Sequence, residues 1–322
     1  MISIIYCTNR LDPKFEWFIE SLKNQTTTEE RSQMELIFID SVMERDKPHE
    51  SANSGSGFSK VIHSKPKPNI YQGAGRKTKT EMFSPSNARN TGILLSSGDY
   101  LIFADDVSIL MPGWWFAAKQ AAEKRMIVCG SYQKHFEMVV ENGNLISSRS
   151  HQGGIDSRWN GGNNGNPVLI QGSQLFGCSF GIPALDILAV NGFDEVCDSI
   201  GGEDYHLGIR LNNIGLRIYY DRRMFTVESE ELHNQPFLML RDDRLLDEGA
   251  YNMRLAEFGV KERKAPGRCD SSHMVLDVLY GTHAIWTIGN NFNMTADRVE
   301  HYFVPPHNTE KHWFDGKLLS EI

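Results

Sequence analysis

The sequence has few cysteines and no long hydrophobic run. Its five cysteines are scattered, odd in number and without a Cys-x-x-Cys pair, which is typical of reduced intracellular proteins rather than of disulfide-stabilised secreted ones. No segment approaches the ~20 consecutive apolar residues that span a bilayer, and the start of the chain becomes polar too soon for a signal peptide. These absences predict a cytoplasmic protein without a transmembrane segment, and they leave a peripheral membrane contact open.

An excess of positive charge is also missing. The chain has 33 Lys and Arg residues against 41 Asp and Glu residues, so its formal net charge is −8. A general nucleic-acid binder needs a basic surface to neutralise phosphates, and this balance therefore disfavours a nucleic-acid partner. It does not exclude one, because the sequence holds a local basic stretch, GRKTKT, at residues 75–80.

What the sequence does contain is an alternation of strand-like and helix-like segments over the first half of its 322 residues. Short β-branched and apolar runs alternate with segments whose apolar residues recur every three or four positions, which predicts βαβ units and a mostly parallel sheet. In the helix expected at 84–97, Ser86 or Asn87 is the expected N-cap. The expected strands are residues 2–8, 34–41, 59–66 and 99–104, and the expected helices are 13–25, 84–97 and 183–190.

Charged and polar residues cluster just past the expected strands. Parallel strands present their carboxyl ends along one side of the sheet, where such folds bind ligands, so these residues predict a ligand site. The adjacent carboxylates of Asp105 and Asp106 suit a divalent metal that neutralises a diphosphate, although they would equally cap the following turn. The residues past strand ends are Thr8, Asn9, Arg10, Asp40, Asp105 and Asp106.

Three later features have a functional and a structural interpretation. In the GGED stretch, Glu203 and Asp204 suit a helix N-terminus electrostatically, but one of them could also be a general base for a sugar hydroxyl. Arg89, in the first turn of its expected helix, would meet either a phosphate or a surface acid. A lone histidine such as His233 is more often structural than a ligand.

A glycine- and asparagine-rich stretch without periodicity at residues 151–167 predicts a long loop, and loops of this length inside a domain are usually functional or mobile. Trp159 in this loop could close over a donor and stack on a sugar ring, or it could anchor the loop to the surface. Trp114 and Trp115 have the same two interpretations, with at least one of them expected in the core.

Taken together and in this order, the segments resemble GT-A-fold glycosyltransferases. The stretches SIIYCTNR, ELIFIDS, SNARNTGILLSSGDYLIFADD and LMPGWW resemble the family-2 type. The later stretch from FGCSFG through NGFDE to GGEDYHLGIRL resembles the C-terminal motif of β-1,4-galactosyltransferases and polypeptide N-acetylgalactosaminyltransferases. The resemblance covers residues 1–233 and implies a Rossmann-like GT-A domain there. Residues 234–322 match no family we can name and are expected to be a helical or mixed extension, on the acceptor side or in oligomerisation.

The resemblance implies that the protein moves a sugar from a nucleotide sugar, most plausibly a UDP-sugar, to a hydroxyl of a carbohydrate or other acceptor, with inversion and with Mn²⁺ or Mg²⁺. The residue roles below follow from the resemblance alone. Asp204 stands at the catalytic base and Glu203 at the neighbouring acceptor-binding acid. Donor contacts fall on Thr8, Arg10, Asp40, Arg89 and Asp105, acceptor contacts on Trp159, Glu203 and Tyr205, and metal ligands on Asp105, Asp106 and His233.

The sequence departs from the family pattern at two positions. Val107 stands where the second acid of the Asp-x-Asp metal motif belongs, and Tyr205 replaces an acid that follows the galactosyltransferase base. Lost metal ligands keep a non-catalytic nucleotide-sugar- or carbohydrate-binding protein as an alternative. A nucleotidyltransferase is a second alternative, but it would need a glycine-rich phosphate loop after the first strand, and the stretch CTNRLDPKF has no glycine.

Overall fold

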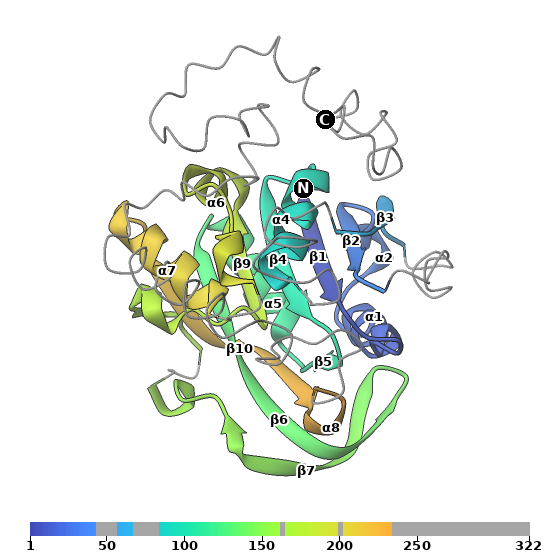
Figure 1. Ribbon diagram of the computed structural model, residues 1–322. Coiled ribbons are helices and arrows are strands. Elements are labelled where there is room, and N and C mark those ends of the chain that lie inside the picture. Colours follow the sequence, from blue (N-terminus) through green and yellow to red (C-terminus); the bar gives the residue numbers. More distant parts are fainter. Residues whose placement is uncertain (43–56, 67–83, 162–164, 199–201, 234–322) are drawn as a thin grey trace, which may run out of the picture.

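The computed structural model describes residues 1–42, 57–66, 84–161, 165–198 and 202–233 (Figure 1). Within these residues one mixed sheet of ten strands is flanked by helices, in the order β3-β2-β1-β4-β9-β6-β10-β5, with β7 paired to β6 and β8 to β10. This confirms the expected fold class. The proposed extension at 234–322, the basic stretch at 75–80 and Cys269 lie outside the described residues, so the expectations for them stay predictions.

The strands and helices follow the apolar runs of the sequence closely. The first three parallel pairs, β2 with β3, β1 with β2 and β1 with β4, form one half of the sheet. The strands are β1 (Ile2–Thr8), β2 (Met34–Asp40), β3 (Lys60–Ser64), β4 (Tyr100–Asp105), β5 (Ser108–Leu110), β6 (Ile127–Glu141), β7 (Asn144–Ile155), β8 (Val168–Ile170), β9 (Ser179–Pro183) and β10 (Ile218–Ser229). The helices are α1 (Phe15–Lys23), α2 (Thr28–Arg31), α4 (Pro85–Leu95), α5 (Trp114–Glu123), α6 (Ala184–Ala189), α7 (Glu203–Asn213) and α8 (Glu230–His233).

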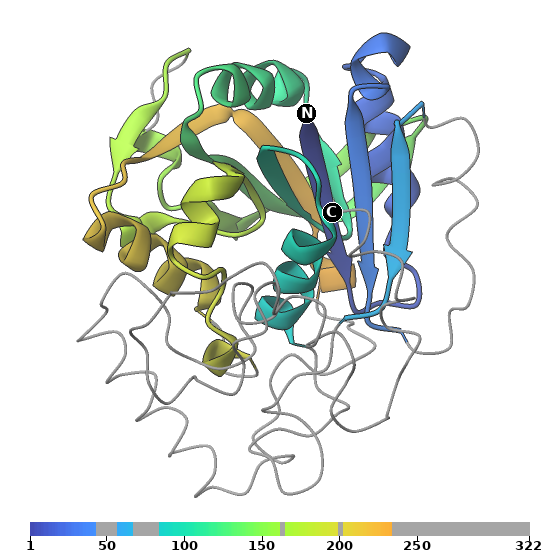
Figure 2. The same cartoon turned by 90° about the horizontal axis from the view of Figure 1, so that it is seen from above.

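The core is divided into two hydrophobic layers, one on each face of the sheet (Figure 2). On one face, α1 and α5 pack against the sheet through residues such as Phe18 and Trp114. On the other face, α4, α6 and α7 pack through residues such as Leu94, Ile187 and Leu211. Alternate residues of the strands point to opposite faces, so β4, whose residues are buried up to Ala104, serves both layers.

The register of the sheet brings the predicted strand-end residues together. Thr8 at the end of β1 pairs with Asp40 at the end of β2, and Cys7 pairs with Asp105 at the end of β4. The carboxyl ends of these three strands therefore lie side by side, as the sequence predicted. Helix α7 reaches the same side through its first turn, because Glu203 accepts a hydrogen bond from Arg89 and Asp204 accepts one from the Gly177 amide.

Several local expectations were wrong. Residues 151–155 belong to β7, which forms a long hairpin with β6, and Trp159–Gly161 form a short 3₁₀ turn, so only part of the expected loop at 151–167 is irregular. Helix α4 starts at Pro85, so Ser86 and Asn87 lie inside its first turn instead of capping it.

None of the helices within the described residues is long and apolar enough to cross a membrane.

Candidate active site

Thr8, Arg10 and Asp106 form one buried hydrogen-bonded group at the ends of β1 and β4. The Thr8 hydroxyl donates to Asp106 Oδ2 at 2.6 Å, and Arg10 Nε donates to Asp106 Oδ1 at 3.0 Å. Burial raises the pKa of Asp106 to about 6, although Arg10 and Thr8 act in the opposite direction. Thr8 and Arg10, which the sequence assigned to the nucleotide, thus contact Asp106, which it assigned to the metal.

Asp40 is buried at the end of β2, and both of its carboxylate oxygens have partners in the protein. Oδ1 accepts a hydrogen bond from the Val42 amide at 3.0 Å, and Oδ2 lies 3.1 Å from His63 Nε2. The imidazole of His63 stacks on Phe38 with ring centroids 4.9 Å apart. Asp40 is therefore at the expected edge of the sheet, where its role toward a nucleotide stays a prediction.

Arg89 joins acids from two distant parts of the chain. It projects from α4, is 6% exposed, and donates from one terminal nitrogen to Asp105 Oδ1 at 2.9 Å and from the other to Glu203 Oε1 at 2.6 Å. The two carboxylates raise the pKa of Arg89 and so keep it charged despite the desolvation that burial imposes. The guanidinium thus connects the end of β4 with the first turn of α7.

Asp204, next to Glu203 on α7, lies against the same group. One carboxylate oxygen accepts a hydrogen bond from the Gly177 amide at 2.8 Å, and the other accepts one from the Tyr205 amide at 2.7 Å. Burial, followed by the nearby charge of Glu203, raises the pKa of Asp204 to about 7, while Arg89 lowers it. A carboxylate with a pKa close to neutrality is suited to accept a proton and release it again.

Glu228 is an acid at this edge that the sequence interpretation missed. It lies near the end of β10, is 4% exposed, and approaches His233 Nδ1 to 4.0 Å. Burial, followed by repulsion from Asp105, raises the pKa of Glu228 to about 8, and burial lowers the pKa of His233. Both pKa shifts favour the neutral form of the side chain near pH 7. We therefore interpret the contact between Glu228 and His233 as one that positions the two side chains and not as an ion pair. The sequence signal that could have indicated Glu228 was a cluster of acidic residues at the end of a strand-like run.

The aromatic candidates lie in packed positions. The guanidinium of Arg222 lies over the ring of Trp159, 4.3 Å from its centroid, and the tilted ring of Phe225 has its centroid 5.0 Å from that of Trp159. Trp114 and Trp115 are both buried core residues of α5, which agrees with the structural interpretation for them. Acceptor contacts through Trp159 and Tyr205 stay predictions.

The N-terminus of α4 is capped by the later motif rather than left open for a phosphate. Asp198 accepts hydrogen bonds from the Ser86 amide at 2.8 Å and from the Asn87 amide at 3.3 Å. One turn further along α4, the Asn90 side chain exchanges hydrogen bonds with the backbone of Phe193. Part of the NGFDEVCD stretch therefore fixes α4, and through it the position of Arg89.

Comparison with known proteins identifies the family. A model of glycosyl transferase family 2 matches residues 3–181, which is more than half of the chain. The chain belongs to glycosyl transferase family 2. This confirms the family-2 resemblance of the first part, whereas the galactosyltransferase-type resemblance lies mostly past the matched residues and stays a prediction. No curated protein sequence matches the chain significantly.

Solved structures share the fold of this family-2 glycosyltransferase. The crystal structure of S. aureus TarS matches with a TM-score of 0.52 at 11% identity, over 81% of this chain and 39% of the TarS chain. The chain thus spans 39% of that protein's length, and the likeness concerns the GT-A fold alone. Structures of TarS 1–349 without and with UDP-GlcNAc match at 12% and 11% identity, with TM-scores of 0.48 and 0.46, over 71% of this chain in each case and over 60% and 58% of theirs.

The acids of this family-2 domain fit a metal ion only in part. Among the residues that the structure describes, no three His, Cys, Asp or Glu side chains lie close enough to hold a metal by themselves. Asp105 and His233 each keep 37% of their side chain exposed, and Mg²⁺ is often held by one or two carboxylates together with substrate phosphates and water. Asp105, which pairs with Arg89 through Oδ1 alone among the described contacts, therefore fits such an ion, and the partly exposed imidazole of His233 is a nitrogen ligand of the kind that metals take. Both oxygens of Asp106, in contrast, accept hydrogen bonds from Thr8 and Arg10.

Replacing Asp204 should change how stability depends on pH. An aspartate has a pKa of ~3.9 in the unfolded chain and about 7 in the folded protein, so the folded state binds this proton more tightly. The favourable contribution of Asp204 to folding stability is complete at pH values below its pKa in the unfolded chain, and it is lost as the pH rises through 7. We expect Asp204→Asn to melt at a higher temperature than the wild type at pH 8 and at nearly the same temperature at pH 4. Equal differences at both pH values would contradict this, and the exposed Glu137→Gln is the control.

Proposed function

We propose that this family-2 enzyme transfers a sugar from a UDP-sugar to an acceptor hydroxyl with inversion, using Asp204 as the base. The observation that carries the proposal is the bridge made by Arg89. Its guanidinium lies 2.9 Å from Asp105 at the end of β4 and 2.6 Å from Glu203 beside Asp204. Because one side chain contacts both, the acid assigned to the donor and the acids assigned to the acceptor belong to a single site.

In the proposed reaction, Asp204 accepts the proton of the acceptor hydroxyl, and the oxygen of that hydroxyl attacks the anomeric carbon. The bond from this carbon to the diphosphate oxygen breaks with its electron pair, UDP leaves, and the new bond forms on the opposite face, so the configuration inverts. Thr8, Arg10 and Asp40 would lie beside the nucleotide, and Trp159 and Tyr205 beside the acceptor. Manganese or magnesium, held by Asp105 and His233, would neutralise the leaving diphosphate.

The two neighbouring carboxylates of α7 differ in their suitability as the base. Glu203 forms a short ion pair with Arg89 and is 12% exposed, so its lone pairs are directed at a fixed cation. Asp204 accepts hydrogen bonds from the backbone amides of Gly177 and Tyr205, and its pKa of about 7 matches a base that acts near neutral pH. These properties support Asp204 as the base and Glu203 as the acid that orients the acceptor.

Calorimetric titration of UDP, first with Mn²⁺ and then with EDTA, tests the donor site. We expect binding that is strong with Mn²⁺ and weak with EDTA, after which a panel of UDP-sugars is screened for release of UDP. Binding that ignores EDTA would remove the metal from the proposal. Nucleotide binding without any UDP release across the panel would favour the non-catalytic alternative, which the valine at position 107 supports.

Asp204→Asn tests the base with the UDP-sugar that the screen selects. The amide keeps the size of the side chain but cannot take a proton, so we expect the rate of UDP release to fall by about 10²–10⁴-fold, with UDP affinity unchanged. Asp186→Asn is a matched control, because Asp186 lies on α6 at the opposite edge of the sheet. A fully active Asp204→Asn would place the base elsewhere.

A further inference from the structure

Val107 has an unusual backbone for its residue type. It is fully buried and has a φ of 50°, a left-handed conformation that is rare for β-branched residues and that persists only when the surroundings impose it. Here its amide donates to the Pro13 carbonyl at 2.9 Å, and its carbonyl accepts from the Ser229 amide at 3.0 Å. The turn after Asp106 is therefore fixed both to the segment before α1 and to the last residue of β10.

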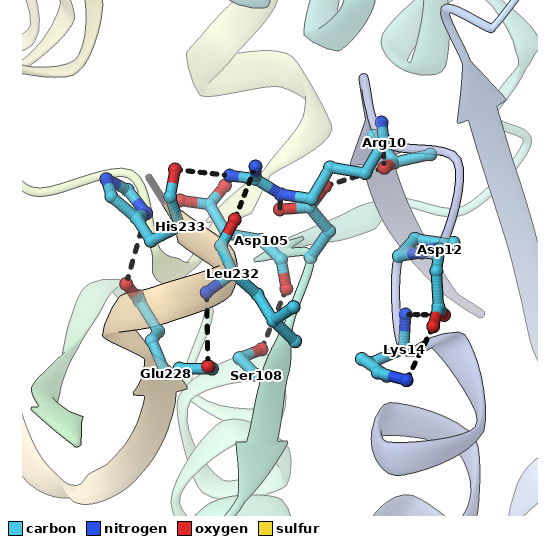
Figure 3. A network of polar contacts seen from close by, with 12 residues as sticks. Arg10, Asp12, Lys14, Asp105, Ser108, Glu228, Leu232 and His233 are labelled. Atoms are coloured by element: carbon cyan, nitrogen blue, oxygen red, sulfur yellow. Dashed lines mark hydrogen bonds and ion pairs between the residues drawn. The ribbon is translucent and has the colours of Figure 1, made fainter. Parts of the chain in front are cut away.

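Arg10 extends this connection to the end of the described chain. Besides its bond to Asp106, its guanidinium donates to the carbonyls of Leu232 at 2.8 Å and His233 at 3.2 Å. These are the last carbonyls of the short helix α8, where a cationic side chain satisfies otherwise unpaired acceptors. Arg10 is 4% exposed, so water competes little for these bonds. Figure 3 shows Arg10 reaching across to Leu232 and His233.

We propose that Thr8, Arg10 and Asp106 form a clamp that positions His233, and that Asp106 acts through this clamp and does not itself bind the metal. The inference rests on the proposed function for its ligand, and it assigns to Arg10 and Asp106 a role other than the one the family resemblance implies. Thr8 and Arg10 occupy both oxygens of Asp106, and Arg10 links the same carboxylate to the backbone that carries the imidazole.

The alternative, in which Asp106 turns to a metal, has a specific physical cost. It would separate the buried guanidinium of Arg10 from the carboxylate that it contacts at 3.0 Å, and breaking a buried ion pair is strongly unfavourable. The clamp instead gives the Asp-Asp-Val sequence a consistent role. Asp105 pairs with Arg89 and stays partly exposed, Asp106 is buried against Thr8 and Arg10, and the backbone of Val107 holds the end of β10.

A double-mutant cycle tests the clamp. Arg10→Met, Asp106→Asn and the double variant are compared with the wild type in Mn²⁺ affinity in the presence of UDP. Loss of a residue that only orients a metal ligand typically costs 10–100-fold in metal affinity, so we expect each single variant to lose about this much. The double variant should lose no more than either single variant, because the two residues act as one unit. Arg149→Met, which removes an exposed ion pair with Glu137, is the control.

Two outcomes of the Mn²⁺ titrations would overturn the clamp. The first is loss of Mn²⁺ binding in Asp106→Asn with retained or stronger binding in Arg10→Met, as expected if Asp106 binds the metal directly. The second is additive losses in the double variant. In the same series, the His233 imidazole signal in NMR spectra of the unliganded protein, assigned with His233→Gln, should shift equally in both single variants. An unchanged signal would also overturn the proposal, even in a protein that does not bind UDP, so the failure of the clamp and that of the proposed function are distinguishable.

Discussion

The arrangement of acids at the sheet edge depends on the guanidinium of Arg89. Asp105, Glu203 and Asp204 come from β4 and α7, and in a partly buried site their mutual repulsion would drive them apart. Arg89 lies between the first two at 2.9 Å and 2.6 Å, and Asp198 holds the N-terminus of α4 that carries it. The NGFDEVCD stretch, which contains Asp198, thereby fixes the helix that carries Arg89. A single cation thus fixes the spacing of the acids, and it counteracts the rise in the pKa of Asp204 that burial and Glu203 cause.

This site is built at a cost in stability. Burial and the neighbouring charge of Glu203 raise the pKa of Asp204, and Val107 keeps a left-handed backbone in the turn after Asp106. Such features persist where the surrounding structure imposes them, and they are frequent at functional sites. The two arginines have different tasks in this account. Arg89 holds the acids that face the reaction, and Arg10 holds the chain segment that carries His233.

The sequence predicted the fold and the edge of the site better than it predicted the contacts within the site. Apolar runs and the polar residues after them placed Thr8, Asp40 and Asp105 together, because parallel register follows from the alternation of strands and helices. The β6–β7 hairpin was missed, since the outer part of β6 has no buried residue and alternates only between partly buried and exposed ones, so no apolar run marks it. The bonds from Arg10 to residues 222 and 223 positions away depend on tertiary packing, which local pattern does not encode. The cap on α4 from Asp198 was unpredictable for the same reason.

A crystal structure with UDP and Mn²⁺ would test the central claim most directly, because it shows where the nucleotide lies and which acid meets the metal. The account predicts the nucleotide over the carboxyl ends of β1, β2 and β4, with Asp105 on the diphosphate side and Asp204 open to the acceptor. It also predicts that the 3.0 Å ion pair between Arg10 and Asp106 is retained. A nucleotide bound at another edge, or Asp106 turned onto the metal, would contradict it.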